Sequence, residues 1–353
     1  MLRLTLMTLM LFGSVAQARA AVEEVPLLRQ TREWLTACDN LRNCHALSAP
    51  SGQMGSEYSS LTLHVTRRSG PQESLRLRLD HRGPALGSFE LLLDGQPLSL
   101  ELQAGMTLEL DDQGTDANLQ SYAVIMEDDG RKWLQQLRNA QRLQMVGDPQ
   151  ASVSLSGLSA ALLLMDSVQG RLEGVTALMR PGPRLANELP PRQLPPAPRT
   201  YATPPPALSD QERARITAAV LKDQAGAMAE ADKPRVEVYP LTAERALTVL
   251  YSACAAYNCD YQIDSRSRSN PAKVQPLKRQ PPPFEVEDSG AVSYDPRTGL
   301  LRTFYKLRGI GDCGDQSQWA FDGQGFQLTD FRRMPLCSGL RSRDWPALWN
   351  SRD

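Results

Sequence analysis

Six cysteines in three close pairs are the feature that most restricts what this chain can fold into. Local pairing closes short loops and is typical of proteins in an oxidising compartment. A zinc site is the alternative, but the spacings differ from the C-x2-C knuckles typical of structural zinc. We therefore predict three local disulfides, no metal site and no cofactor. The predicted pairs are Cys38 with Cys44, Cys254 with Cys259, and Cys313 with Cys337.

The first 20 residues predict export. Arg3 precedes the apolar run LTLMTLMLFGSV, and Ala18-Arg19-Ala20 follows as an A-x-A cleavage site, with Ala16-Gln17-Ala18 as the alternative. This order of a basic region, a short apolar region and small residues is that of a secretory signal peptide. No later apolar run approaches the roughly 20 residues needed to cross a bilayer. We therefore expect residues 1–20 to be a signal peptide, no transmembrane segment after its removal, and a protein that is periplasmic or secreted.

The charge balance argues against nucleic acid as a partner. The formal net charge is −1, and removal of the signal peptide takes away Arg3 and Arg19 and no acidic residue, which leaves −3. A protein that binds a phosphate backbone needs a clustered basic surface. We therefore expect a partner other than nucleic acid.

A proline-rich segment divides the chain. Residues 181–207 contain ten prolines, and proline neither donates to a sheet ladder nor favours helix at the residue before it. We predict a semi-rigid spacer, with a proline-motif ligand for a partner domain as the alternative. The spacer separates a predicted N-terminal domain, residues 21–180, from a predicted C-terminal domain, residues 208–353.

The N-terminal half is patterned as strands followed by helices. Apolar and polar residues alternate in LTLHV and LRLRL, which is the period of a half-buried strand, and Asp94-Gly95 is typical of a hairpin turn. RKWLQQLRNAQRL and GLSAALLLMDSVQGR then have apolar residues at helical spacing. This order predicts an α+β fold. On these patterns His64 faces solvent, and Asp166 and Gln169 lie on the exposed side of their helix.

The C-terminal half is predicted to have the same composition of elements. Ser209 and Glu212 form a capping box that begins one helix, and TAERALTVLYSAC has the apolar spacing of a second. Two hairpins follow, one turning at residues 295–299 and one around Asp322-Gly323. We therefore predict an α+β fold of two domains, each a mainly antiparallel sheet with a few packed helices, joined by the Pro-rich linker.

The string GIGDCGDQ around Cys313 resembles the loop of a catalytic nucleophile. Glycines in such a loop let the backbone form an oxyanion hole, but the cysteine also needs a base within hydrogen-bond reach. Antiparallel pairing around residues 322–325 brings Cys313 and Cys337 together, so we favour a disulfide. The candidate bases all precede the linker: His45, His64 and His81.

A basic stretch from Ser265 to Phe284 contains no acidic residue and is the candidate binding segment. An anionic partner, such as lipopolysaccharide or an acidic protein face, is the functional interpretation. A solvated, proline-interrupted loop is the plain alternative. The candidate binding residues are Arg266, Arg268, Lys273, Lys278 and Arg279.

Several longer strings occur together in a fixed order. They are WLTACDNLRNCHA, SLSGLSAALLLMDSVQGR, CAAYN and GLLRTFYKLRGIGDCGDQSQWAFDGQGFQL, with MPLCSGL and DWPALW after them. In this order they resemble a family of bacterial secreted proteins named domain of unknown function 1176. The resemblance implies an exported bacterial protein and assigns no catalytic residue. Cys259, directly after CAAYN, departs from the family pattern.

These patterns favour binding over catalysis. We predict a non-catalytic module of the cell envelope that binds an envelope protein or glycan. The alternative is a hydrolase of envelope or peptide bonds that uses Cys313 or the carboxylates of Asp312 and Asp315.

Overall fold

A computed structural model of the whole chain gives the structure. It describes residues 23–48, 61–71, 75–83, 90–98, 107–111, 120–127, 130–192, 201, 204–224, 234–275 and 277–351. The predicted signal peptide, residues 1–20, lies outside these ranges, as do residues 193–200 and 202–203 of the predicted linker.

The N-terminal half is built on two antiparallel sheets. Within the described ranges, one sheet has seven strands in the order β1-β2-β3-β4-β5-β9-β8, and a smaller one has four in the order β11-β10-β6-β7. The hairpin predicted at Asp94-Gly95 is confirmed, because these residues join β6 to β7. The strands are β1 (Leu27–Thr31), β2 (Trp34–Cys38), β3 (Cys44–Ser48), β4 (Leu61–Arg67), β5 (Leu75–Gly83), β6 (Leu91–Leu93), β7 (Gln96–Leu98), β8 (Thr107–Asp111), β9 (Gln120–Glu127), β10 (Arg142–Met145) and β11 (Asp148–Ser154).

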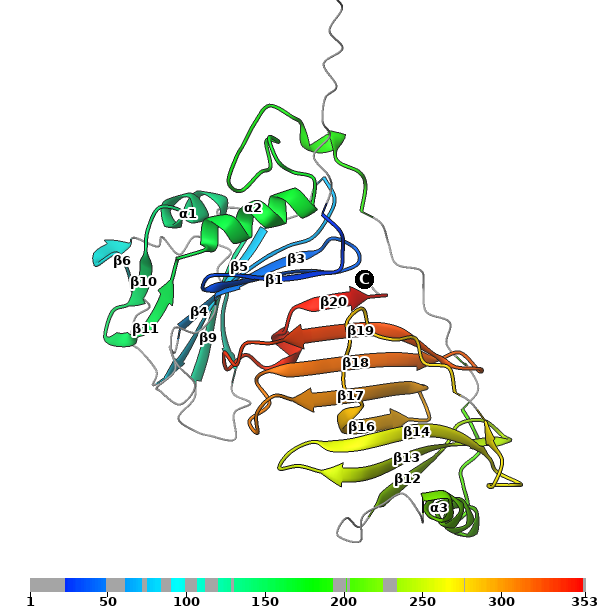
Figure 1. Cartoon of the computed structure of the whole chain (residues 1–353). Coiled ribbons are helices and arrows are strands. Elements are labelled where there is room, and N and C mark those ends of the chain that lie inside the picture. Colours follow the sequence, from blue (N-terminus) through cyan, green and yellow to red (C-terminus); the bar gives the residue numbers. More distant parts are fainter. Residues whose placement is uncertain are drawn as a thin grey trace, which may run out of the picture.

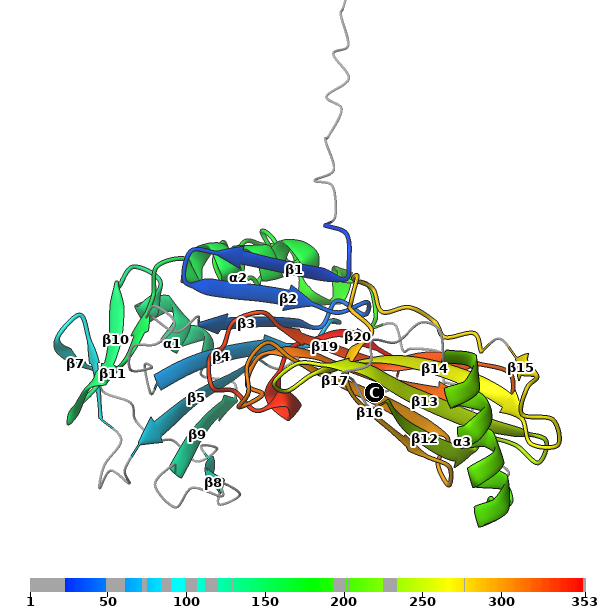
Figure 2. The same ribbon diagram turned by 60° about the horizontal axis from the view of Figure 1, so that its bottom comes forward.

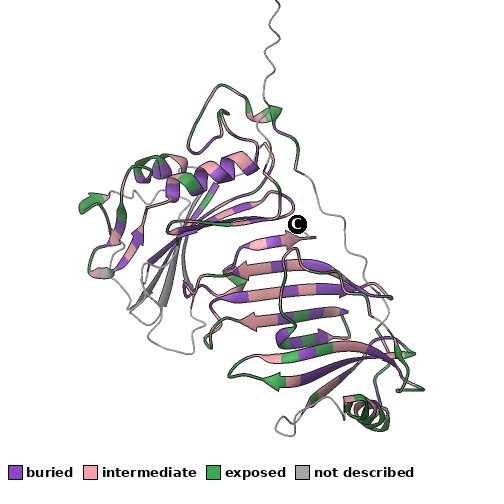
Figure 3. Ribbon diagram, in the orientation of Figure 1, coloured by how far each residue is buried: buried purple, intermediate pink, exposed green. Residues whose placement is uncertain are grey.

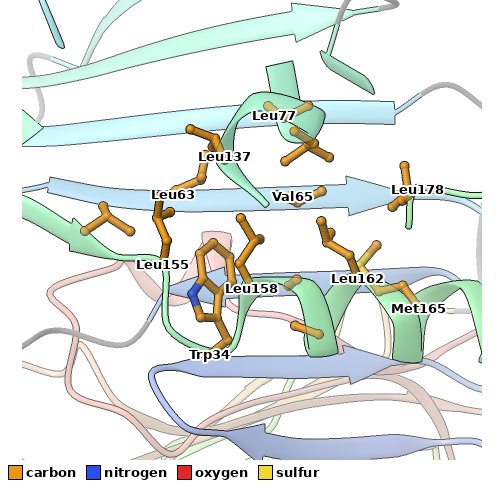
Figure 4. Close-up of a cluster of buried hydrophobic side chains, with 14 of the residues drawn as sticks. Trp34, Leu63, Val65, Leu77, Leu137, Leu155, Leu158, Leu162, Met165 and Leu178 are labelled. Atoms are coloured by element: carbon orange, nitrogen blue, oxygen red, sulfur yellow. The ribbon is translucent and has the colours of Figure 1, made fainter. Parts of the chain in front are cut away.

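Two helices cover one face of the seven-stranded sheet. Helix α1 (Gly130–Leu137) and helix α2 (Leu158–Val168) confirm both helices predicted in this half. In Figure 4, Leu162 and Met165 of α2 gather with Trp34 and Val65 of the sheet in one buried cluster. This burial of apolar surface stabilises the helix more than its intrinsic propensity does.

The C-terminal half is one strongly twisted antiparallel sheet. Among the residues described, nine strands belong to it, in the order β12-β13-β14-β16-β17-β18-β19-β20, with β15 paired to β14. Both predicted hairpins are confirmed, as β16–β17 and β18–β19. The strands are β12 (Arg235–Pro240), β13 (Arg245–Cys254), β14 (Cys259–Ser267), β15 (Val274–Gln275), β16 (Ser289–Asp295), β17 (Leu300–Lys306), β18 (Gly314–Phe321), β19 (Phe326–Met334) and β20 (Ala347–Asn350).

Helix α3 (Asp210–Gln224) lies against β12 at the opposite end of the molecule from α2 (Figure 2). Its predicted capping box is confirmed, because Ser209 N–H donates to Glu212 Oε2 at 2.9 Å and Glu212 N–H donates to Ser209 Oγ at 3.2 Å. Most of the helix is exposed (Figure 3), since only Ile216 and Val220 are buried. None of the helices in the part of the chain that the structure describes is long and apolar enough to span a bilayer. Two short 3-10 turns complete the elements, η1 (Ala186–Glu188) and η2 (Ser342–Asp344).

The second helix predicted in this half is wrong. Strand β13 occupies most of TAERALTVLYSAC and pairs with β12 on one side and β14 on the other. Its two faces are both buried: Leu247 and Val249 join the main core of the sheet, and Ala246 packs under α3. A strand that is buried on both faces is a continuous apolar run, and periodicity cannot separate such a run from a helix.

The two halves share buried surface where β2 meets the C-terminal strands. All five residues of β2 are buried. Successive residues of a strand point to opposite faces, so Trp34 packs under α2 while Leu35 packs with Met334 and Trp345. Figure 1 shows α2 on one side of β1 and β3 and β20 on the other. Mainly antiparallel sheets with a few helices are thus confirmed, whereas the division into two domains at residues 181–207 stays a prediction.

The prediction that His64 faces solvent is wrong. Its side chain is 7% exposed, and its ring Nε2 lies 3.0 Å from Nδ1 of His45. His64 lies opposite Leu47 in the β3–β4 ladder, and Leu47 packs against Trp345. The alternation of β4 therefore identified two faces correctly, but the C-terminal half covers the face that the sequence predicted to be solvated.

The predicted exposure of Asp166 and Gln169 on α2 is also wrong. Their side chains are buried, and both contact Arg67 at the end of β4: Arg67 Nη2 lies 2.7 Å from Asp166 Oδ1, and Arg67 Nε donates to Gln169 Oε1 at 2.6 Å. Asp166 Oδ2 also accepts the backbone N–H groups of Leu178 and Met179 at 2.8 and 3.1 Å. These contacts meet the requirement that a buried charge be paired and hydrogen-bonded.

Candidate interaction surface

The three predicted disulfides are confirmed. Two of them close tight hairpins, Cys38–Cys44 between β2 and β3 and Cys254–Cys259 between β13 and β14. The third joins positions 24 residues apart, Cys313 at the start of β18 and Cys337 after the end of β19. All six sulfurs are bonded in pairs, so the described chain has no free thiol.

The loop that contains Cys313 is held in place from several sides. Asp312 accepts hydrogen bonds from Arg308, whose Nε lies 2.6 Å away, and from the backbone N–H of Gly339 at 2.6 Å. Leu307 N–H donates to the carbonyl of Cys313 at 3.0 Å. The disulfide and these bonds together fix residues 307–313 against the segment after β19.

Gly314 allows this loop to enter β18. Its φ is +138°, and a Cβ at this position would lie 1.9 Å from the carbonyl oxygen of Tyr305. Only glycine adopts such a conformation without a steric penalty and leaves room for this close backbone approach. The glycine-flanked cysteine that resembled a nucleophile loop is thus explained by chain geometry.

A second disulfide loop, residues 254–259, lies directly beside the first. The side chain of Asn258 forms two hydrogen bonds with the backbone of Lys306, donating to its carbonyl at 2.7 Å and accepting its N–H at 3.1 Å. The hydroxyl of Tyr257 donates to the carbonyl of Leu307 at 3.2 Å. The amide of Asn258 thus makes the pair of hydrogen bonds with Lys306 that the backbone of a neighbouring strand would make. It joins the ends of two hairpins that are distant in sequence.

Large apolar side chains project from these two loops into solvent. Tyr257 is 46% exposed, Leu307 is 45% exposed and Ile310 is 71% exposed. Ala253, Ala255 and Ala256 beside Tyr257 are exposed as well. We call residues 253–258 and 307–311 the braced surface.

The braced surface has little free charge near its centre. Arg308 is paired with Asp312. Lys306 keeps its charge but lies outside the braced surface, with its ammonium over the ring of Phe304, 5.8 Å from the centroid. Burial raises the pKa of Tyr305 nearby, and the negative charges of Glu287 and Asp315 raise it further, so its phenol stays neutral. A contact made here is therefore mainly apolar, with polar groups at the edge, which is the composition of a protein-binding interface.

Each candidate catalytic group is held by a partner of its own: Cys313 by a disulfide, and Asp312 and Asp315 by hydrogen bonds from arginines. Cys313 Sγ is bonded to Cys337, and Asp312 Oδ1 lies 3.9 Å from it. Asp315 is bound by the guanidinium of Arg333, with N–O distances of 2.7 and 2.8 Å. The one set of at least three metal-ligating groups among the described residues is Asp312, Cys313 and Cys337, and its two sulfurs are bonded to each other.

The arginines of the candidate binding segment form ion pairs in two different places. Arg266 lies 2.7 Å from Asp223, and Arg268 lies 3.1 Å from Glu212, so both attach the end of β14 to α3. Arg279 is paired with Asp288, directly before β16. Lys273 and Lys278 are exposed. The three arginines of this segment are thus already paired with carboxylates. Contact of the five residues with an anionic partner stays a prediction.

Sequence reasoning missed the three exposed residues of the braced surface. Tyr257 lies in CAAYN, two residues before Cys259. Leu307 and Ile310 lie in KLRGIGDC, where Ile310 stands between two glycines and three residues before a cysteine. This combination was an available signal, because a loop that is held by a disulfide has no need of an exposed isoleucine for its own folding.

The fold and the braced surface define a class: disulfide-stabilised proteins of antiparallel sheets that present apolar side chains on fixed loops. The chain belongs to the family described as Protein of unknown function (DUF1176), which matches residues 28–352, so the resemblance of its strings is confirmed. It is similar to Uncharacterized protein YpfG of Escherichia coli (strain K12), with 28% identity over 366 residues, which cover 97% of this chain and 98% of that protein. No solved structure matches.

Proposed function

We propose that this protein is an exported, non-catalytic module of the bacterial cell envelope that binds another protein through the braced surface. The observation that supports this most is Ile310, which is 71% exposed at the tip of a loop fixed by a disulfide. Exposed apolar patches on folded proteins mark interaction sites. A loop that is already ordered loses little conformational entropy on binding, which increases affinity.

Export is supported by two features of the chain. Residues 1–20 have the order of a signal peptide, and three disulfides are typical of an oxidising compartment. The test is fractionation of the cells that produce the full chain, with mass spectrometry of the N-terminus. Cleavage after Ala20 and recovery from the periplasm or medium are expected, whereas an intact N-terminus in the cytoplasm contradicts export.

No observation among the described residues favours the alternative hydrolase. The thiolate that such an enzyme needs is absent while Cys313 is bonded to Cys337. Asp312 and Asp315 each accept hydrogen bonds from a different arginine, Arg308 and Arg333. These contacts support a binding module over a hydrolase.

Site-specific photocrosslinking in intact cells tests the binding proposal. A photoreactive phenylalanine analogue at position 310 is expected to capture one protein that the same analogue at Leu185 does not capture. Leu185 is a matched control, because it is an apolar residue that is 55% exposed and lies outside the braced surface.

The variant Ile310→Asp is expected to reduce recovery of that partner by about tenfold or more, the usual cost of removing a central apolar contact, whereas Leu185→Asp leaves it unchanged. Identical crosslinks at the two positions, or unchanged recovery with Ile310→Asp, contradict the proposed role of the braced surface.

A further inference from the structure

The C-terminal sheet contains a gap between β14 and β16. These strands pair only at Cys259 with Gly290 and Asp260 with Ser289, and β15 resumes the pairing at Ser265. Tyr261 N–H still donates to the carbonyl of Asp288 at 2.9 Å, and residues 262–264 then face a space that no strand of the described chain fills. A cavity of about 330 Å³ opens there, lined by Tyr261, Gln262, Ile263, Leu277, Arg279 and Asp288.

One wall of the cavity is the segment between β15 and β16, residues 277–288. It crosses β18 and β19 (Figure 1) and is fixed to them. Phe326 N–H donates to the carbonyl of Lys278 at 2.7 Å, and the indole N–H of Trp319 donates to the carbonyl of Gln280 at 2.9 Å. The wall is thus attached by hydrogen bonds to both strands, and the cavity is a preformed site rather than a gap under a loose loop.

The polar groups of the cavity carry opposite charges that cancel. Arg279 donates to the carboxylate of Asp288, and its guanidinium lies 5.2 Å from the centroid of the Trp319 ring. The side chain of Asp288 remains 59% exposed. Burial raises the pKa of Tyr261, so its phenol is a neutral group that donates and accepts hydrogen bonds.

The apolar part of the lining is small and lies on one side. Tyr261 and Ile263 belong to the same face of β14, and Leu277 is the third apolar residue of the lining; all three belong to or pack against the main core of the sheet. The volume lies at the lower end of the range for small-molecule sites, about 300–1,000 Å³. A fitting ligand is therefore small, with one apolar face and several hydrogen-bonding groups.

We propose that this cavity binds a neutral pyranose ring of a glycan. A carboxylate or phosphate ligand is repelled by Asp288, and a cationic ligand is repelled by Arg279, so the paired charges favour a neutral molecule. Sugar hydroxyls donate to Asp288 and accept from Arg279, while the C–H face of the ring packs on the small apolar part of the lining. The inference goes beyond the proposed function, because it rests on the cavity and not on the braced surface.

Saturation-transfer NMR with three probes tests the assignment: methyl β-D-glucopyranoside, N-acetylglucosamine and glucuronic acid. The two neutral sugars are expected to show transfer from the protein, and glucuronic acid is not. Absence of transfer to both neutral sugars overturns the proposal, as does glucuronic acid binding equal to theirs.

Asp288→Asn gives the sharper result. This variant removes an acceptor and unpairs Arg279, so affinity for the neutral sugars should fall by about tenfold, the cost of a lost charge-assisted hydrogen bond, and glucuronic acid should begin to bind. Asp260→Asn is the matched control, since Asp260 is an exposed carboxylate of the same strand outside the lining.

Unchanged sugar binding in Asp288→Asn, or an equal loss in Asp260→Asn, contradicts the assigned site. Ile310→Asp should retain full sugar binding, so that failure of the braced surface and failure of the cavity give different results. Thermal unfolding of each variant verifies that the fold is intact.

Discussion

Arg67 and Asp166 form an ion pair that is almost completely excluded from solvent. The guanidinium Nη2 lies 2.7 Å from the carboxylate Oδ1, and the side chains are 1% and 0% exposed. Burial lowers the pKa of Arg67, and the adjacent charge of Asp166 opposes that effect. The pair attaches α2 to the end of β4, at the polar side of an otherwise apolar helix.

Asp166→Asn is expected to destabilise the protein by about 3–5 kcal/mol, because it leaves the buried guanidinium without a counter-charge. Urea unfolding measures the change. Glu23→Gln is the control, since it breaks the solvent-exposed pair with Arg29, and such pairs contribute little. Equal stability of Asp166→Asn and the unmodified protein would show that Arg67 finds another partner or water.

The contact between half-buried His45 and buried His64 predicts a loss of stability in mild acid. Burial lowers the pKa of His45 to about 4, and the positive charge of Arg332 adds to the effect. Burial also lowers the pKa of His64, and so do the positive charges of His45, Arg78 and Arg76. Below about pH 6.5 the unfolded chain binds protons that the folded chain does not.

The free energy of unfolding should therefore fall as the pH decreases from about 6.5 to about 4, by at most about 1.4 kcal/mol per pH unit for each histidine. His45→Gln should make this slope shallower, because it removes one of the two titrating groups. The measurement is urea unfolding at several pH values. The same slope in the variant and the unmodified protein argues against a contribution from this pair.

Disulfide Cys313–Cys337 should contribute more stability than Cys254–Cys259. The first joins residues 24 apart and the second residues 5 apart. In the chain-entropy model these closures are worth about 3.5 and about 2 kcal/mol. Replacement of each pair by alanine, followed by urea unfolding, gives the comparison. A larger loss from the short loop contradicts the entropic explanation.

Gly314→Ala is expected to destabilise the protein by more than about 1 kcal/mol, because the new Cβ combines a positive φ with a clash. Its φ is +138°, and the Tyr305 carbonyl oxygen lies 1.9 Å from the Cβ position. Gly309→Ala in the same loop is the control, since its Cβ meets only Tyr257 Cδ1 at 3.7 Å. Thermal unfolding of both variants measures the difference. Equal melting temperatures would contradict a steric requirement for glycine at position 314.

The two halves should stay together after the chain is cut between them. Leu35 and Leu47 pack with Trp345, and the side chain of Asn40 exchanges two hydrogen bonds with the backbone of Asn350, at 3.2 and 2.8 Å. A protease site inserted after Pro190 should yield two fragments that elute together in size-exclusion chromatography, because burial of this shared surface is favourable.

Leu35→Asp should separate those fragments, since it places a carboxylate in the apolar contact. Leu185→Asp, at an exposed position, should not. Separation of the unmodified fragments after cleavage would instead support the two independent domains predicted from the proline-rich segment.

The disulfides, the caps and the hairpin turns could be predicted because short stretches encode them. Cys313 and Cys337 lie at similar distances from the turn of their hairpin, and Ser209 lies three residues before Glu212. Each feature depends on residues that are close in sequence or symmetric about one turn. Apolar spacing also identified α2 correctly, because one of its faces is continuous.

The errors share one cause, which is a partner distant in sequence. Strand β13 resembled a helix because α3 covers one of its faces and the main core the other. Asp166 resembled a solvent-facing residue because its partner, Arg67, lies 99 positions away in the sequence and no local pattern predicts the contact. The exposure of Ile310 likewise depends on how two disulfide loops from different hairpins meet.

The sequence by itself determined the covalent crosslinks, most strands and turns, two amphipathic helices and the family to which the chain belongs. Only the tertiary structure decided which face of each strand is covered, which charges are buried as pairs and which apolar side chains remain in solvent. The physical reason is that burial is a property of two surfaces in contact, and a local pattern specifies only one of them.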